Sequence, residues 1–230
     1  FLEGYVDTYY KNRRDHALIF SMACTRPAQT CFCGTFDIDA SKPEGDVRMY
    51  KDEKFLYLEA VSEKGEKILS SLDCLDEGGE KEVKEQISLI KERLAKLPLA
   101  DLKKDAFGNG KTSAFFDAPE WKGLSESCIA CGTCTFVCPT CQCYDIKDLN
   151  TGHGVKRFRC WDSCMYSDFT KMSAGQPRLT QLERFRQRFM HKLVYYPTAH
   201  GGLFSCVGCG RCLSKCPIQM NIVKVMKELG

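Results

Sequence analysis

A repeated cysteine pattern constrains this chain more than any other feature of its sequence. Residues 127–139 read SCIACGTCTFVCP and residues 205–217 read SCVGCGRCLSKCP, so that seven of the thirteen positions are identical. Each copy has the spacing C-x2-C-x2-C-x3-C-P. The chain has 16 cysteines among its 230 residues, and twelve of them lie after residue 120. This concentration indicates ligands rather than ordinary core residues.

The spacing within each copy is typical of a loop that holds a cubane 4Fe–4S cluster. Three thiolates on one tight turn can cap three corners of a cube. The proline after the fourth cysteine favours an extended backbone there, which turns that thiolate elsewhere. In two-cluster ferredoxins the fourth cysteine binds the other cluster. The pattern therefore predicts two 4Fe–4S clusters, with iron bound by crossed ligand sets. Cluster 1 is predicted to take Cys128, Cys131, Cys134 and Cys216, and cluster 2 to take Cys206, Cys209, Cys212 and Cys138.

Other uses of these cysteines fit the spacing less well. Cysteines three residues apart on one turn face a common centre rather than distant disulfide partners. Structural zinc takes two separated pairs rather than a triplet followed by Cys-Pro. The sequence also lacks a nucleophile elbow, a Walker loop, a dinucleotide fingerprint and a histidine metal motif. We therefore expect one-electron transfer and no catalytic side chain.

Eight further cysteines lie outside the repeat. Four follow the first copy, and they are either ligands of another cluster or buried thiols beside the first two. These four are Cys141, Cys143, Cys160 and Cys164. The other four precede residue 120. Three of them lie on one loop and could hold an N-terminal cluster, whose fourth ligand would be Cys74 or a residue upstream of Phe1. These four are Cys24, Cys31, Cys33 and Cys74. The sequence therefore leaves open whether the chain holds one or two additional clusters.

Apolar periodicity and turn residues predict an α+β fold with two domains. Residues 1–120 are expected to form an N-terminal mixed α/β domain. Residues 121–230 are expected to form a helical, loop-rich, two-cluster ferredoxin-like domain, in which residues 139–205 are a long insertion between the two cysteine motifs. Because the first residue is Phe1 rather than Met, we also expect a missing upstream segment.

Local signals place the elements within these domains. The expected strands are residues 17–22, 47–50 and 55–59, the last two as a hairpin, and the expected helices are residues 2–14, 62–69 and 80–97. A capping box of Thr180 and Glu183 predicts the start of a later helix, and Asn221 caps the last one. We expect the remainder of the second domain to be rich in loops.

Charge is distributed unevenly along the chain. Residues 121–230 carry 15 Lys and Arg against 7 Asp and Glu, a net charge of +8, while residues 1–120 carry 18 against 23, a net charge of −5. The helix after Thr180 has a basic face, and our preferred interpretation is that this face is exposed to solvent. The alternatives are a docking surface for an acidic partner or a counter-charge to anionic clusters. The residues of this face are Arg184, Arg186, Arg188 and Lys192, with Arg178 just before them.

Two classes of partner are disfavoured by the sequence. No aromatic stacking platform accompanies the basic face, so nucleic acid is not expected. No apolar run approaches the roughly 18 residues that a membrane span requires.

Several motifs in order resemble one group of proteins. They are CIACGTCTFVCPTCQCYDI, RCWDSCMYSDF, RLTQLERFRQRFMHKL and GGLFSCVGCGRCLSKCP, together with ALIFSMACTRPAQTCFCGTFD near the N-terminus. The group comprises the beta subunit of soluble NiFe hydrogenase (sulfhydrogenase) and the A subunit of anaerobic sulfite reductase. The resemblance covers most of the chain and is weakest over residues 37–120.

The resemblance implies a cytoplasmic electron-transfer subunit of a hetero-oligomeric oxidoreductase. Such a subunit relays electrons between a flavin-containing, NAD(P)-linked subunit and a catalytic subunit of the hydrogenase or sulfite reductase type. The alternative from another class is a cysteine-rich, zinc-bound structural or regulatory module that binds an acidic partner. That alternative predicts binding without redox activity.

Overall fold

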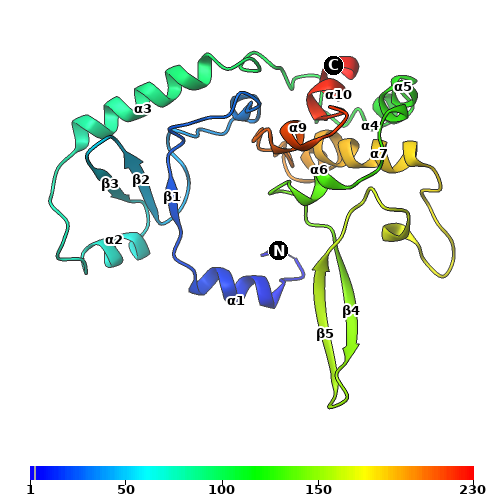
Figure 1. Cartoon of the computed structure of the whole chain (residues 1–230), viewed down its shortest axis with the longest axis horizontal. Coiled ribbons are helices and arrows are strands. Elements are labelled where there is room, and N and C mark those ends of the chain that lie inside the picture. The colour runs from blue at the N-terminus through cyan, green and yellow to red at the C-terminus, as the bar shows by residue number, and fades with distance from the viewer. Residues whose placement is uncertain (3) are drawn as a thin grey trace. The chain divides into compact units, whose positions relative to one another are not determined.

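The computed structural model describes residues 1–2 and 4–230, and it divides them into two compact units. Unit 1 consists of Phe1–Pro27 and Asp39–Lys96, and unit 2 of Ala28–Ile38 and Leu97–Gly230. Small sheets and many helices make up the chain, which confirms the predicted α+β class (Figure 1). Within the described residues, no helix has both the length and the apolar character needed to cross a membrane.

Unit 1 is built on a three-stranded sheet of β1 (Phe20–Met22), β2 (Val47–Lys51) and β3 (Leu56–Ala60). Strand β1 runs parallel to β2, and β2 pairs antiparallel with β3, which confirms the predicted hairpin. The carboxylate of Asp52 closes the hairpin turn by accepting the backbone N–H groups of Lys54 and Phe55, both at 2.7 Å.

Three helices complete unit 1: α1 (Thr8–His16), α2 (Glu63–Leu69) and α3 (Glu80–Ala95). Helix α1 begins at Thr8 rather than at residue 2, because the side chain of Asp7 caps it by accepting the Tyr10 N–H at 3.0 Å. Helix α3 buries Ile90 in a small core with Ala23 and Tyr50.

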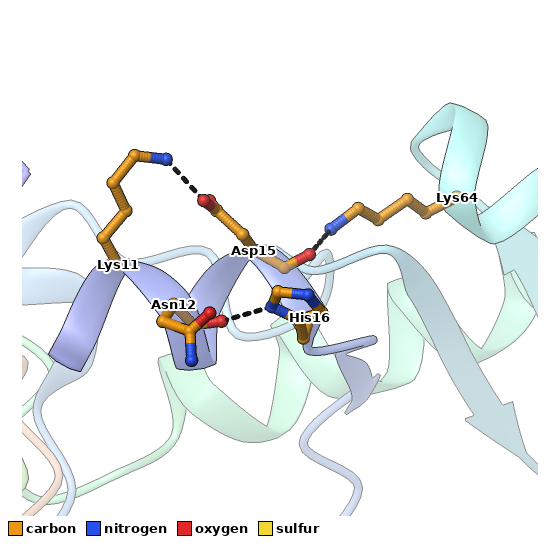
Figure 2. A network of polar contacts seen from close by, with 5 residues as sticks. All are labelled: Lys11, Asn12, Asp15, His16 and Lys64. Carbon is orange, nitrogen blue, oxygen red and sulfur yellow. Dashed lines mark hydrogen bonds and ion pairs between the residues drawn. The ribbon is translucent and has the colours of Figure 1, made fainter. Parts of the chain in front are cut away.

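An exposed polar network links α1 to α2, as Figure 2 shows. Lys64 on α2 donates to the carbonyl of Asp15 at 2.7 Å, and the side chain of Asp15 pairs with Lys11. His16 Nδ1 hydrogen-bonds the carbonyl of Asn12 at 2.7 Å. Exposed pairs of this kind contribute little to stability, so they position α1 rather than hold unit 1 together.

Unit 2 is organised around one long helical segment. Helix α7 (Gln181–Met190) continues through a π-helical turn, η3 (His191–Tyr195), into α8 (Tyr196–Ala199). Its start has the predicted capping box between Thr180 and Glu183. Phe185, Phe189 and Leu193 point into the main hydrophobic core, where they meet α5 (Glu120–Glu126) and α10 (Ile222–Leu229).

The remaining elements of unit 2 are short. They are η1 (Cys33–Phe36), α4 (Thr112–Phe116), α6 (Thr133–Phe136), β4 (Tyr144–Asn150), β5 (Val155–Trp161), η2 (Ser167–Thr170) and α9 (Arg211–Lys215). Strands β4 and β5 form an antiparallel hairpin that projects from the rest of unit 2 (Figure 1). Loops were expected in this region, and the structure differs because these two strands are exposed on both faces and have no buried apolar side to mark them in the sequence.

The unit boundary falls at Leu97, whereas charge and cysteine content placed a domain boundary at residue 120. Residues before 120 join the core of unit 2, and the indole N–H of Trp121 donates to the carbonyl of Phe115 at 2.6 Å. The segment Ala28–Ile38 joins it as well, because Phe32 and Phe36 are buried there. Core membership depends on contacts between distant residues, which composition along the chain does not reveal.

Candidate metal centre

Two hollows in unit 2 are each lined by four cysteines. The first has about 410 Å³ of empty space, its open side included, and is lined by Cys128, Cys131, Cys134 and Cys216. The second has about 340 Å³ and is lined by Cys138, Cys206, Cys209 and Cys212. Each hollow therefore receives three cysteines from one copy of the motif and the last cysteine from the other. This is the grouping that the crossed assignment predicts, and the individual ligand bonds stay a prediction.

The backbone of each motif explains how the cysteines reach their hollow. Gly132 and Gly210 have φ of +71° and +68°, and each ends its loop at the start of a short helix, α6 or α9. A Cβ atom on Gly210 would lie 2.3 Å from the carbonyl oxygen of Thr30, so only glycine fits there. Cys216, which precedes a proline, is extended with φ −75° and ψ 117°.

The lining of the hollows fits a 4Fe–4S cluster in its chemistry. Both are lined by thiols, apolar groups, one threonine and at least one buried cation, with no carboxylate or imidazole among the lining residues. Soft thiolate donors favour iron–sulfur clusters, zinc and Cu(I). Among residues 1–2 and 4–230, no three His, Cys, Asp or Glu side chains are arranged to hold a single metal ion. A 4Fe–4S cluster has four iron corners, one for each cysteine of a hollow.

Hydroxyl groups and burial adjust the thiols of each hollow. The Thr133 hydroxyl lies 3.3 Å from Cys131 Sγ and lowers the pKa of that thiol. The Thr140 hydroxyl lies 3.2 Å from Cys138 Sγ. Burial raises the pKa of Cys134 and of Cys212, and raises that of Cys206 to about 12. Thiols of this kind ionise when they bind a metal, so cluster uptake releases protons.

Two cations of α7 and η3 are buried beside these thiols. Arg188 is 2% exposed and Lys192 is 3% exposed, so the prediction of a solvated basic face is wrong for both. Arg188 Nη2 donates to the carbonyl of Cys134 at 3.1 Å and lines both hollows. Lys192 Nζ donates to the carbonyl of Ser205 at 2.7 Å and lies 3.1 Å from the Thr140 hydroxyl at the second hollow. The alternative of a counter-charge to anionic clusters fits this placement.

The four cysteines of the insertion are brought together only in part. Hydrogen bonding between the Cys143 and Cys164 thiols lowers the pKa of Cys143 and raises that of Cys164. A hydrogen bond between the Cys138 and Cys141 thiols likewise lowers the pKa of Cys138 and raises that of Cys141. The fourth, Cys160, lies on β5, where its thiol donates to the carbonyl of Asp145 at 3.9 Å. An additional cluster in the insertion stays a prediction.

The four N-terminal cysteines are divided between the units. Cys31 and Cys33 belong to unit 2, where Cys31 Sγ donates to the carbonyl of Cys209 at 3.6 Å. Cys24 and Cys74 belong to unit 1, and Cys74 is exposed. The N-terminal cluster proposed from these residues stays a prediction.

Comparison with known proteins identifies the same cofactor. Residues 127–220 match the family of 4Fe-4S dicluster domains. The whole chain is 32% identical to a protein named sulfhydrogenase 2 subunit beta from Pyrococcus furiosus, and the match covers 68% of that protein. No solved structure matches the chain significantly. The dicluster match confirms the predicted pair of 4Fe–4S clusters and disfavours the zinc-bound alternative.

Proposed function

This chain belongs to the family of the sulfhydrogenase beta subunit, and from this premise we propose that it relays single electrons within a cytoplasmic hydrogenase-type complex. In this proposal the electrons pass between a flavin-containing, NAD(P)-linked subunit and a catalytic subunit. The observation that supports it is the pair of four-cysteine hollows within one core, with ligand loops that cross from one hollow to the other. Bound 4Fe–4S clusters supply one-electron redox chemistry.

The chain's own residues have three tasks in this function. The eight motif cysteines hold the clusters, with Cys128, Cys131, Cys134 and Cys216 at the first hollow and Cys206, Cys209, Cys212 and Cys138 at the second. Apolar side chains such as Met165, Phe185 and Phe189 keep water from the first hollow. Hydroxyls, backbone groups and buried cations adjust the charge around the sulfurs. None of these tasks moves a proton or a chemical group, as a relay subunit requires.

Metal analysis tests the first half of the proposal. The full chain, purified and reconstituted without oxygen, is expected to hold about eight iron and eight acid-labile sulfide, because each 4Fe–4S cluster contributes four of each. A larger content would favour ligation by the additional cysteines. Colourless protein with stoichiometric zinc, and no electron paramagnetic resonance (EPR) signal after reduction, would contradict the proposal.

The relay role requires the assembled complex. We expect the complex without this chain to lose activity driven by NAD(P)H, while the catalytic subunit keeps its activity with a small artificial electron donor. Adding back the reconstituted chain should restore the NAD(P)H-driven reaction. If that reaction persists without the chain, the electrons follow another path.

A further inference from the structure

Arg188 stands at the boundary between the two hollows. It is the one residue in the described part of the chain that lines both of them. Helix α7 places it beside Phe185 and Phe189 in the buried core, where only 2% of its surface is exposed. One nitrogen, Nη2, is occupied by its hydrogen bond to the carbonyl of Cys134.

Two other nitrogens of the guanidinium have no hydrogen-bond partner, although its Cζ lies 4.5 Å from the centroid of the Phe189 ring. Across the residues that the structure describes, three buried side-chain nitrogens have no hydrogen-bond partner, and two of them are Nε and Nη1 of Arg188. Buried donors are almost always paired, because an unpaired one loses its hydration without compensation. These two nitrogens of Arg188 carry three N–H groups, which lie at the wall shared by the hollows and therefore point to an acceptor inside them.

Arg188 brings a fixed positive charge to this wall, because a guanidinium is not deprotonated in proteins. It lines the first hollow together with Cys134 and the second together with Cys212. One cation thus stands beside the cysteines of each hollow.

We propose that Arg188 donates through Nε and Nη1 to sulfur atoms in both hollows and so raises the reduction potentials of both clusters together. This inference rests on the proposed function. A cluster held by four thiolates is an anion and gains one more negative charge on reduction, so a buried cation stabilises the reduced form more than the oxidised form. Lys192 lines the second hollow alone, and it raises the potential of that cluster above that of the first.

Charge-removing variants of the full, reconstituted chain test this assignment. The readout is the midpoint potential of each cluster in an anaerobic titration followed by EPR, with iron and sulfide content measured on the same samples. Arg188→Gln is expected to lower both midpoints. Lys192→Gln is expected to lower the higher midpoint and leave the other in place.

Arg186→Gln is the matched control. It removes the same charge from the same helix, but Arg186 stacks on Phe116 at 3.5 Å and donates to the Phe116 carbonyl at 3.1 Å, and it lines neither hollow. Both midpoints should stay at their wild-type values. If Arg188→Gln binds two clusters and their midpoint potentials equal those measured in Arg186→Gln, the inference is overturned. Equal shifts of both midpoints in Lys192→Gln would overturn the role given to Lys192.

If Arg188→Gln fails to bind iron, the variant Arg188→Lys tests the inference instead. A lysine ammonium is a single point of charge and lacks the planar fork of arginine, so it can serve one hollow only. We expect one midpoint to fall while the other stays, and two unchanged midpoints would overturn the inference. A wild-type chain without two clusters would instead refute the proposed function, which keeps the two failures distinct.

Discussion

The two hollows share one sequence motif but have different surroundings. Both have four cysteines at the same spacing, yet the first is walled mainly by apolar side chains such as Met165 and Ile218. Arg188 lines both hollows, but Lys192 and, from a distant segment, Phe32 line only the second. The repeated motif therefore places four cysteines at each hollow, while parts of the chain outside the repeat decide what else surrounds it.

The enclosure of the second hollow shows how much depends on a distant segment. Residues Ala28–Ile38 lie against the second motif, where the Phe32 N–H donates to the carbonyl of Gly208 at 2.7 Å. A Cβ atom on Gly210 would lie 2.3 Å from the Thr30 carbonyl oxygen of this segment. At the first motif, the atoms nearest to a Cβ on Gly132 belong to the side chain of Tyr166. The second motif thus meets rigid backbone where the first meets a side chain that can move.

The largest effect is expected from Cys138→Ser, a variant that tests whether each hollow takes its fourth ligand from the other motif. Cys138 lies in the first motif but lines the second hollow, so Cys138→Ser should damage the cluster held by Cys206, Cys209 and Cys212. Iron is expected to fall from about eight atoms per chain to about four, or to about seven if a three-iron cluster remains. EPR and iron analysis on the reconstituted chain provide the measurement.

The control for this prediction is Cys160→Ser, which changes a thiol on β5 that lines neither hollow. If the two hollows hold all the iron, its iron content should equal that of the wild type, whereas a loss would show that the insertion holds a further cluster. The reciprocal variant, Cys216→Ser, should affect the cluster of the first hollow. If Cys138→Ser changes the signal of the first cluster only, each motif holds its own cluster and the comparison between the hollows must be redrawn.

A second prediction concerns the packing of the two motifs. An alanine at Gly210 or at Gly132 adopts a positive φ, which costs about 1–2 kcal/mol at either position. At Gly210 the added Cβ also meets the Thr30 backbone at 2.3 Å, whereas at Gly132 it meets the Tyr166 hydroxyl at 2.7 Å. Gly210→Ala should therefore lower the denaturation midpoint of the reconstituted chain more than Gly132→Ala does.

Gly123→Ala is the matched control for these glycine variants. Gly123 lies within α5, and a Cβ there meets no atom within 4 Å. Alanine is favoured over glycine in a helix by about 1 kcal/mol, so this variant should be unchanged or slightly stabilised. Equal losses in Gly210→Ala and Gly132→Ala would mean that the segment Ala28–Ile38 does not restrain the second motif.

Local signals allowed much of this architecture to be predicted from the sequence. Cysteine spacing predicted how the eight motif cysteines group at the two hollows. Turn residues predicted the hairpin of β2 and β3, and a capping box predicted the start of α7. Each of these signals involves residues only a few positions apart. Such signals act between neighbours in the chain, so they can be recognised without knowledge of the fold.

Features that depend on distant contacts were not predictable in this way. On α7, Arg188 and Arg184 look alike in sequence, but Arg188 is buried and lines both hollows, whereas Arg184 lines neither. The membership of Ala28–Ile38 in unit 2 depends on contacts with residues about 175 positions away, such as that between Phe32 and Gly208. The sequence signal that could have indicated a buried Arg188 is its spacing of three residues from Phe185, which places both side chains on the same face of the helix.

The smallest predicted effect concerns a hydrogen-bond network that only the first motif has. The hydroxyl of Thr135, a residue 4% exposed, donates to the carbonyl of Gly132 at 2.6 Å and lies 2.8 Å from the Ser163 hydroxyl. The equivalent position in the second copy is Leu213, which has no hydroxyl. Thr135→Val keeps the shape but leaves the buried Ser163 hydroxyl short of a partner, at a cost of about 1–3 kcal/mol in the free energy of unfolding.

The contrast between the motifs also supplies the control for Thr135→Val. Ser214, on α9 of the second motif, is exposed and donates to the carbonyl of Arg211 at 3.0 Å, so Ser214→Ala should change stability by less than about 0.5 kcal/mol. Anaerobic denaturation of the two reconstituted variants compares them directly. Because Thr135 holds Gly132 and the segment around Ser163 together, Thr135→Val should also release iron from the first cluster faster than from the second. Equal rates of release from both clusters would mean that this network supports unit 2 as a whole rather than the first hollow.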